Sequence, residues 1–160
     1  FVPAGGARER ERMRSYLERT QGRSLMEDLL ADEVRAGERL VAIDDDAALI
    51  APYAAATPYR LWVVPRGRED RFEQSTHRGA AMLFTALAAL RAALGSTPPL
   101  NLWVRTAPAG AEGFGWRIEI APRIGQPAGM ELGTGVNINA VPPEAAATTL
   151  RDSPGRSTGE

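Results

Sequence analysis

Apolar residues recur along the chain at helical spacing in some stretches and at strand spacing in others. Residues 7–22 are strongly charged with one narrow apolar stripe, which predicts a surface helix that ends at a glycine. Residues 24–37 predict a second helix, because leucines and a valine share one face and another glycine closes the segment. Ser24 and Glu27 have the spacing of a capping box, which marks the start of this second helix.

Five short runs that are apolar or alternating predict β-strands. The runs are residues 39–43, 47–52, 59–65, 100–106 and 115–123. Three aspartates, residues 44–46, separate the first two runs and predict a tight turn. They lack the spaced oxygen ligands and the glycine of a dedicated calcium loop, so a metal role is disfavoured.

The remaining segments complete the predicted order of elements. Residues 76–94 have high helical propensity and are apolar over most of their circumference, which predicts a helix buried on a sheet. Residues 129–141 are punctuated by glycine, and their second half, GVNINAV, alternates like a short strand. Two prolines then open a final helix over residues 142–151.

This order predicts an α+β domain with a mostly antiparallel five-stranded sheet and packed helices. The domain is expected to span residues 1–151, and the polar residues 152–160 are expected to be a disordered tail. The succession of strands does not suit a doubly wound dinucleotide fold.

Charge and composition remove several functional classes. The 160 residues include 19 basic and 20 acidic side chains, a net charge of -1, so no field gathers nucleic acid or anionic lipid. Without cysteine there is no disulfide, thiolate nucleophile or sulfur-ligated metal, and the single His77 is too little for a usual zinc site. No run approaches the about 18 apolar residues of a membrane span. We therefore expect a cytoplasmic chain with no metal, no cofactor, no nucleic-acid partner and no membrane partner.

Individual side chains offer few candidates for chemistry. His77 lies near the start of the long helix, where a surface histidine is the simpler interpretation. Arg117 and Glu119 share one side of a strand and predict an ordinary, partly exposed ion pair. Three tryptophans on separate strands are expected in the core rather than in a stacking platform: Trp62, Trp103 and Trp116.

Asparagines within GVNINAV could bind hydroxyl groups or phosphate oxygens. Asn137 and Asn139 are two residues apart, so on a strand they would share one face beside glycine-rich backbone. The alternative is an edge strand whose polar face is simply hydrated.

Three stretches taken together resemble the second half of the galactose-1-phosphate uridylyltransferase family. They are LWVVPR at 61–66, GWRIEIAPR at 115–123 and GMELGTGVNINAVPPEAAATTLR at 129–151. The resemblance covers about residues 1–151 and implies a histidine-triad-like fold, built in that family as two similar halves. It also implies that the first half of such a protein, which ends in a His-x-His-x-Gln nucleophile motif, is missing here.

This sequence departs from the family at each position that the resemblance associates with a metal. Gly115 and Arg117 replace the two histidines of a strand that commonly reads HWHIEI. Ser24 and Glu27 replace two cysteines, and Arg68 replaces a histidine after the third strand. The resemblance therefore implies a dismantled metal site, on strands that persist because they carry the fold.

The family's covalent chemistry also needs a nucleophilic histidine that this chain lacks. The resemblance implies the C-terminal portion of a nucleotidyltransferase that acts between sugar phosphates, with no catalytic residue of its own. Glu131 matches a glutamate that contacts hexose hydroxyls, in a segment that begins at Gly129. Asn137 lies near a residue that contacts phosphate, but a one-residue difference in spacing leaves Asn139 equally open. The expected partners are a sugar phosphate or nucleotide sugar, the missing N-terminal half, and a second copy in a homodimer.

Two other functions remain open from the sequence. The loss of metal ligands favours a non-catalytic interaction or dimerisation domain derived from the same fold. A small nucleotide-binding protein that is active alone would need a phosphate site built from Arg66, Arg68 and Arg123.

Overall fold

Five antiparallel strands form one sheet in the computed structural model, which describes residues 4–125 and 128–153. The spatial order is β1-β2-β3-β5-β4, and every neighbouring pair is antiparallel. The strands are β1 (Leu40–Ile43), β2 (Ala47–Ile50), β3 (Leu61–Pro65), β4 (Leu100–Arg105) and β5 (Arg117–Pro122). The predicted α+β class and the five predicted strands of the sheet are confirmed.

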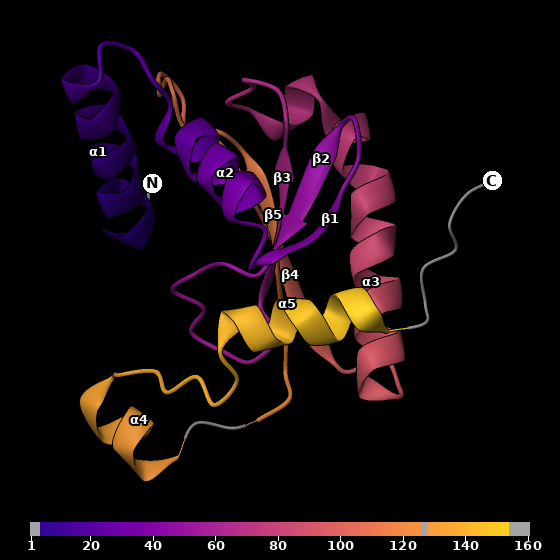
Figure 1. Cartoon of the computed structure of the whole chain (residues 1–160). Helices are drawn as coiled ribbons and strands as arrows, with labels where there is room; N and C mark the ends of the chain where they lie inside the picture. The colour runs from indigo at the N-terminus through magenta and orange to yellow at the C-terminus, as the bar shows by residue number, and fades with distance from the viewer. Residues whose placement is uncertain (1–3, 126–127, 154–160) are drawn as a thin grey trace.

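Helices cover both faces of this sheet (Figure 1). In chain order they are α1 (Ala4–Arg19), α2 (Leu25–Ala36), the 3-10 turns η1 (Phe72–Gln74) and η2 (Thr76–Gly79), α3 (Ala80–Leu94), α4 (Gly129–Thr134) and α5 (Pro143–Asp152). Helices α3 and α5 pack on one face, whereas α1 and α2 lie over the other (Figure 1). The helix α4 projects from this body together with the residues around it (Figure 1).

Alternation along the strands divides the apolar residues between two cores. The larger core lies under α3 and α5 and includes Leu61, Val63, Ile118, Ile120, Leu90 and Leu150. The smaller core lies under α2 and includes Ile50, Val64, Met26, Leu30 and Phe114. The strands at the centre are therefore apolar on both faces, whereas β5 carries Arg117 and Glu119 on the α1 side.

Two predicted local features are confirmed in detail. The Ser24 side chain accepts a hydrogen bond from the Glu27 amide at 3.5 Å, so it caps α2 as the sequence predicted. The turn between β1 and β2 is closed by Asp44, whose Oδ1 accepts hydrogen bonds from the amides of Asp46 and Ala47. These aspartates thus act as turn residues.

Three predictions need correction. Residues 135–141 do not form a strand, because the chain before them folds into the short helix α4 and continues as irregular backbone. The predicted helix at 76–94 starts as the 3-10 turn η2 and is buried over less of its surface than expected, since the apolar side chain of Phe84 is 73% exposed. In the predicted tail, Asp152 belongs to α5, and residues 154–160 lie outside the described residues.

None of the described helices is both long enough and apolar enough to cross a membrane.

Candidate functional site

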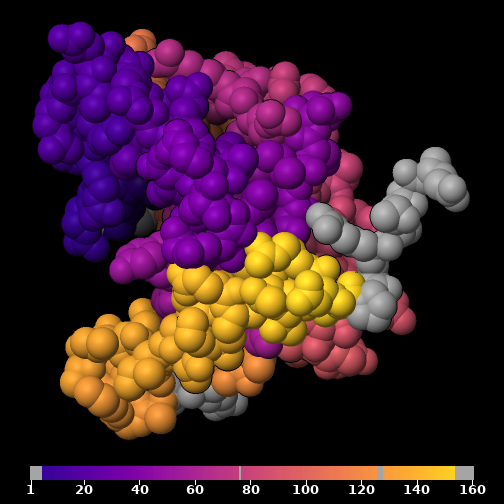
Figure 2. Space-filling model, viewed as in Figure 1, coloured from indigo at the N-terminus to yellow at the C-terminus, as the bar shows by residue number. Residues whose placement is uncertain are grey.

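The segment 128–141 contains all the residues that the sequence assigned to a sugar-phosphate site. It forms a lobe beside α5 that stands out from the rest of the molecule (Figure 2). Four of its apolar side chains are more than half exposed: Met130 at 64%, Leu132 at 75%, Val136 at 56% and Ile138 at 53%. Monomeric proteins rarely expose such a cluster without a partner to cover it.

Glu131 organises this lobe. One carboxylate oxygen accepts a hydrogen bond from the amide of Ala128 at 2.9 Å, and the other accepts one from the amide of Ile138 at 3.0 Å. These two backbone donors hold the pKa of Glu131 below its ordinary value. Glu131 is therefore an oriented carboxylate anion, with acceptor capacity left for hydroxyl groups.

The other predicted residues lie in the same lobe but not on one strand face. Gly129 is the first residue of α4 and is exposed, with open space where a Cβ would stand. Asn137 is exposed, whereas Asn139 accepts a hydrogen bond from Val141 and its buried Nδ2 has no partner in the described part of the chain. The asparagines thus differ in environment, because the irregular backbone does not alternate as a strand would.

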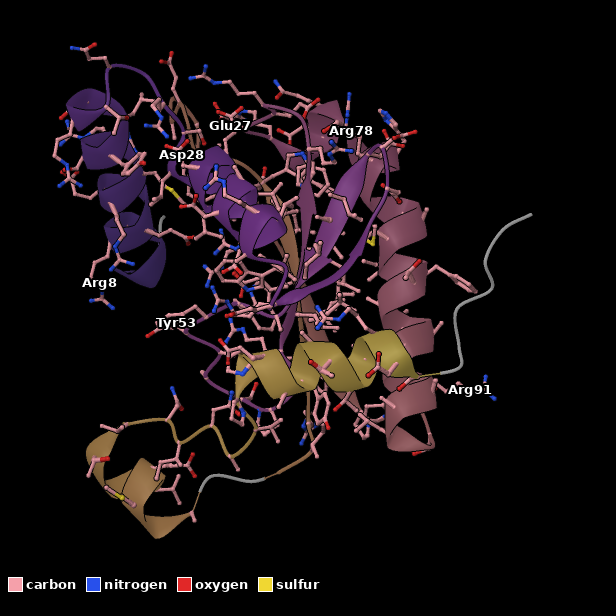
Figure 3. All side chains as sticks on the ribbon, viewed as in Figure 1. Arg8, Glu27, Asp28, Tyr53, Arg78 and Arg91 are labelled. Carbon is pink, nitrogen blue, oxygen red and sulfur yellow. The ribbon has the colours of Figure 1, made fainter. Side chains whose placement is uncertain are left out.

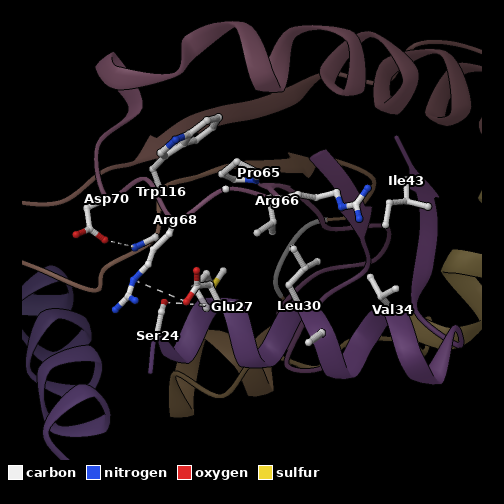
Figure 4. Close-up of a pocket in the computed structure, with 15 residues that line it drawn as sticks. Ser24, Glu27, Leu30, Val34, Ile43, Pro65, Arg66, Arg68, Asp70 and Trp116 are labelled. Carbon is white, nitrogen blue, oxygen red and sulfur yellow. Dashed lines mark hydrogen bonds and ion pairs between the residues drawn. The ribbon is translucent and has the colours of Figure 1, made fainter. Parts of the chain in front are cut away.

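Four of the five positions that the resemblance associates with a metal come together elsewhere, at the end of β3 nearest α2, whereas Arg117 lines a different hollow. Ser24, Glu27, Arg68 and Gly115 all line one cavity of about 320 Å³ (Figure 4). Arg68 and Glu27 form an ion pair of 3.9 Å across it, and Arg68 also donates to the carbonyl of Gly22 at 2.6 Å. Arg66, Asp70 and apolar side chains of α2 and of the strands contribute to the rest of the wall.

These residues do not fit a metal ion. A guanidinium has no lone pair to donate, a glycine has no side chain, and the Ser24 hydroxyl is occupied as a helix cap. Residues 4–125 and 128–153 contain no group of three or more His, Cys, Asp or Glu that could hold a metal ion. The side chains that line this cavity therefore do not provide the donors of a metal site.

The surroundings of Gly115 leave no room for a side chain. Its φ is +62°, and a Cβ placed there would lie 2.7 Å from the Cβ of Met26 on α2. Asp70 fixes this backbone by accepting hydrogen bonds from the amides of Gly113 and Gly115 at 2.9 and 3.0 Å. A histidine at position 115 would therefore collide with α2.

The pair Arg117 and Glu119 is buried, which corrects the prediction of a partly exposed ion pair. Their exposed fractions are 5% and 1%. The carboxylate of Glu119 is bound by Arg117 at 2.7 Å, by Arg105 at 3.3 Å and by Arg60. Burial alone would raise the pKa of Glu119, but the three guanidinium groups outweigh burial and lower it.

Of the three tryptophans, only Trp116 lies fully in the core as predicted, with 0% exposure. Its indole donates to the Ser75 hydroxyl at 2.9 Å. Trp62 and Trp103 are half-buried on the opposite face of the sheet, under the guanidinium groups of Arg117 and Arg60 respectively. The sequence showed apolar positions but not which arginines would stack on them.

The remaining candidates do not form a site. His77 is exposed in η2, as a surface histidine was expected to be. Arg66 and Arg68 line the cavity beside α2, but Arg123 follows the far end of β5. Because β3 and β5 are antiparallel, Arg123 lies at the opposite end of the sheet from Arg66. The proposed three-arginine phosphate site is therefore not assembled.

The sheet order and its helical cover define a histidine-triad-like α+β fold. No family model matches the sequence. A histidine-triad-like protein from Bartonella henselae superposes with a TM-score of 0.52 at 14% identity, covering 76% of this chain and 93% of that chain. At this identity the similarity shows the fold alone.

Proteins of the galactose-1-phosphate uridylyltransferase type are more similar. A GalT-like protein from Arabidopsis thaliana has a TM-score of 0.80 at 23% identity, covering 96% of this chain and 52% of its own. A uridylyltransferase structure has a TM-score of 0.82 at 20% identity, covering 94% and 52%. The chain thus has the fold of a GalT-like domain, and the half coverage agrees with a C-terminal domain as the motifs predicted.

One curated protein is similar to this chain in sequence. ADP-glucose phosphorylase from Arabidopsis thaliana is 28% identical over 111 residues, which make up 64% of this chain and 32% of that protein. This chain therefore spans about half of the solved chains, and its match to the curated relative covers about a third of that protein.

Proposed function

We propose that this chain is the C-terminal portion of a nucleotidyltransferase of the galactose-1-phosphate uridylyltransferase type. In this role it contributes contacts to a sugar phosphate and an interface to the missing N-terminal half. It is inactive alone, because its one histidine is an exposed residue of η2 and cannot replace the nucleophile motif. The proposed site residues are Gly129, Glu131, Asn137 and Asn139.

The oriented carboxylate of Glu131 is the observation that carries this proposal. Two backbone amides, those of Ala128 and Ile138, keep it ionised and fixed in place within an otherwise exposed lobe. Hydroxyl groups of a hexose are donors that such a carboxylate binds well. The exposed Met130 and Leu132 on the same lobe supply an apolar surface that a second protein half would cover.

The test is a titration of the purified chain with galactose 1-phosphate, UDP-glucose and ADP-glucose, followed by backbone amide shifts in NMR. We expect shifts at residues 128–139, and we expect Glu131→Gln to weaken the shifts of these residues. Glu112→Gln is the matched control, because Glu112 is an exposed glutamate in a loop outside the lobe. If the fold is intact and no amide of the lobe moves with any of the three ligands, the half-site proposal is wrong.

A non-catalytic interaction or dimerisation domain is the second candidate, and the exposed apolar side chains of the lobe favour it directly. Sedimentation equilibrium tests whether the lobe mediates self-association. If the lobe mediates self-association, Leu132→Ser yields a monomer, whereas Phe84→Ser does not, although Phe84 on α3 is almost equally exposed at 73%. A wild-type chain that remains monomeric at all concentrations would exclude homodimerisation through this lobe.

A further inference from the structure

A second hollow, of about 370 Å³, lies between α1, α2 and the face of the sheet that carries Arg117. Its charged lining consists of five arginines and two glutamates. Apolar atoms of Trp62, Met13 and Leu29 form the rest of the wall. It is distinct from the lobe at 128–141, because none of the residues that line it belongs to that segment.

Positive charges outnumber negative charges at the base of this hollow. Arg60, Arg105 and Arg117 face only two carboxylates, those of Glu9 and Glu119. Glu9 reaches from α1 to Arg117 at 2.6 Å and to Arg105 at 3.8 Å. Each of the three arginines pairs with at least one carboxylate, but the group keeps one excess positive charge, on side chains that range from 6% to 38% exposed. Excess charge is costly where it is shielded from water.

Two more arginines add to this excess at the mouth of the hollow. Arg8 and Arg12 are four residues apart on α1, so both lie on the side of the helix that lines the hollow. Figure 3 shows the side chain of Arg8 extending from the amino-terminal end of α1. Neither arginine has a carboxylate partner in the described part of the chain. The lining as a whole thus carries an excess of three positive charges.

Arg117 adds an independent sign that an acceptor is missing. Its side chain is 6% exposed, and its guanidinium carbon lies 4.4 Å from the centroid of the Trp62 ring. Its Nη1 is buried with no hydrogen-bond partner in the described residues. A buried donor without an acceptor is destabilising. A bound anion would offset the surplus positive charge around it and offer further acceptor oxygens.

We propose that this hollow is a binding site for a small oxyanion of the phosphate type. A tetrahedral oxyanion presents several acceptor oxygens at once, which suits the several N–H donors of convergent guanidinium groups. Arg8, Arg12 and Arg105 bind the anion directly, and the guanidinium of Arg117 at the base of the hollow contributes positive charge. Glu9 acts as an internal competitor, because its carboxylate already holds Arg117 and Arg105.

The indole N–H signals of two tryptophans provide the readout in an NMR titration with inorganic phosphate at constant ionic strength. The Trp62 indole lines the hollow and is expected to shift. The Trp116 indole is buried on the other face of the sheet, bonded to Ser75, and is expected to stay in place. Constant ionic strength separates site binding from general screening.

Three variants test the proposal, because they are expected to change the affinity for phosphate in different directions. Glu9→Gln removes the internal competitor and is expected to tighten phosphate binding about threefold or more. Arg8→Gln, an exposed substitution that spares the fold, is expected to weaken binding about two- to fivefold. Arg14→Gln is the matched control on α1, because Arg14 pairs with the exposed Glu11 and is expected to leave binding unchanged.

The outcomes are decisive for this site and separate from those for the lobe. Absence of a Trp62 shift at about 10 mM phosphate overturns the proposal, since binding weaker than this has no cellular meaning. A shift that Arg8→Gln and Glu9→Gln leave unchanged also overturns it. Sugar-phosphate shifts at residues 128–139 test the lobe alone, so either proposal can fail while the other stands.

Discussion

Replacing Glu119 by glutamine should be the most damaging single charge change in this molecule. The substitution keeps the size of the side chain but removes the carboxylate that three arginines share. Glu119 is 1% exposed, and the side chains of Arg117, Arg60 and Arg105 are 6%, 20% and 38% exposed. Removing one partner of a buried ion pair costs about 3–5 kcal/mol, because the remaining charge stays buried without compensation.

The partial exposure of Arg105 places the expected loss near the lower end of that range. We predict that Glu119→Gln lowers the free energy of unfolding by about 3 kcal/mol, which corresponds to about 6–12 °C in Tm for a domain of this size. Urea unfolding followed by tryptophan fluorescence at pH 7 measures the change. Glu11→Gln is the matched control, because its ion pair with Arg14 is exposed and its loss should leave stability nearly unchanged.

A double-mutant cycle tests the reasoning itself. If buried charge is the cause, replacing Glu119 and Arg117 together by Gln and Met should cost less than the sum of the single changes. A loss below about 1 kcal/mol for Glu119→Gln would refute the argument, because it would show that the network is hydrated and behaves like a surface pair.

The remaining predictions concern the same face of the sheet. Gly115→Ala should destabilise by more than about 1 kcal/mol in thermal unfolding, because φ is +62° and its Cβ would meet Met26 at 2.7 Å, whereas Gly125→Ala, with open space around it, should not. Asp70→Ala should cost about 1–3 kcal/mol in urea unfolding, because two backbone amides of the loop before β5 lose their acceptor. The folded-state pKa of Glu119 lies below its ordinary value of 4.5, so the stabilisation by its carboxylate is present above pH 4.5 and is lost as the pH falls through the folded-state pKa. The free energy of unfolding of Glu119→Gln should therefore depend less on pH than that of the wild type in this acidic range. Parallel pH dependences of the two proteins would contradict this.

Local chemistry made much of the fold predictable from the sequence. The cap at Ser24, the glycine that ends α2 and the aspartate turn before β2 act within a few residues, and all three were read correctly. The strand at 115–123 was also recognised, since Ile118 and Ile120 alternate into the core. The strand predicted at 135–141 failed because glycines there permit a short helix and irregular backbone just as readily.

Sites were harder to predict because their residues are distant in the sequence. The buried network joins Glu9 to Arg117 across 108 positions and Arg60 to Glu119 across 59, and no local pattern records such pairings. The resemblance identified Ser24, Glu27, Arg68 and Gly115 as altered positions, but only the tertiary structure placed them around one cavity. A mixture of arginines and glutamates on one strand was the available signal for the network, and it was read as a surface pair.

The sequence by itself determined the five strands of the sheet, most of the helices and the absence of a cysteine, because these depend on composition and on spacing along the chain. Tertiary structure alone decided which charges are buried, which tryptophans are stacked under arginine, and that the lobe of residues 128–141 stands away from the body. The physical reason is that burial and charge balance depend on which surfaces meet, and the packing of α1 and α2 over the sheet sets this across long sequence separations.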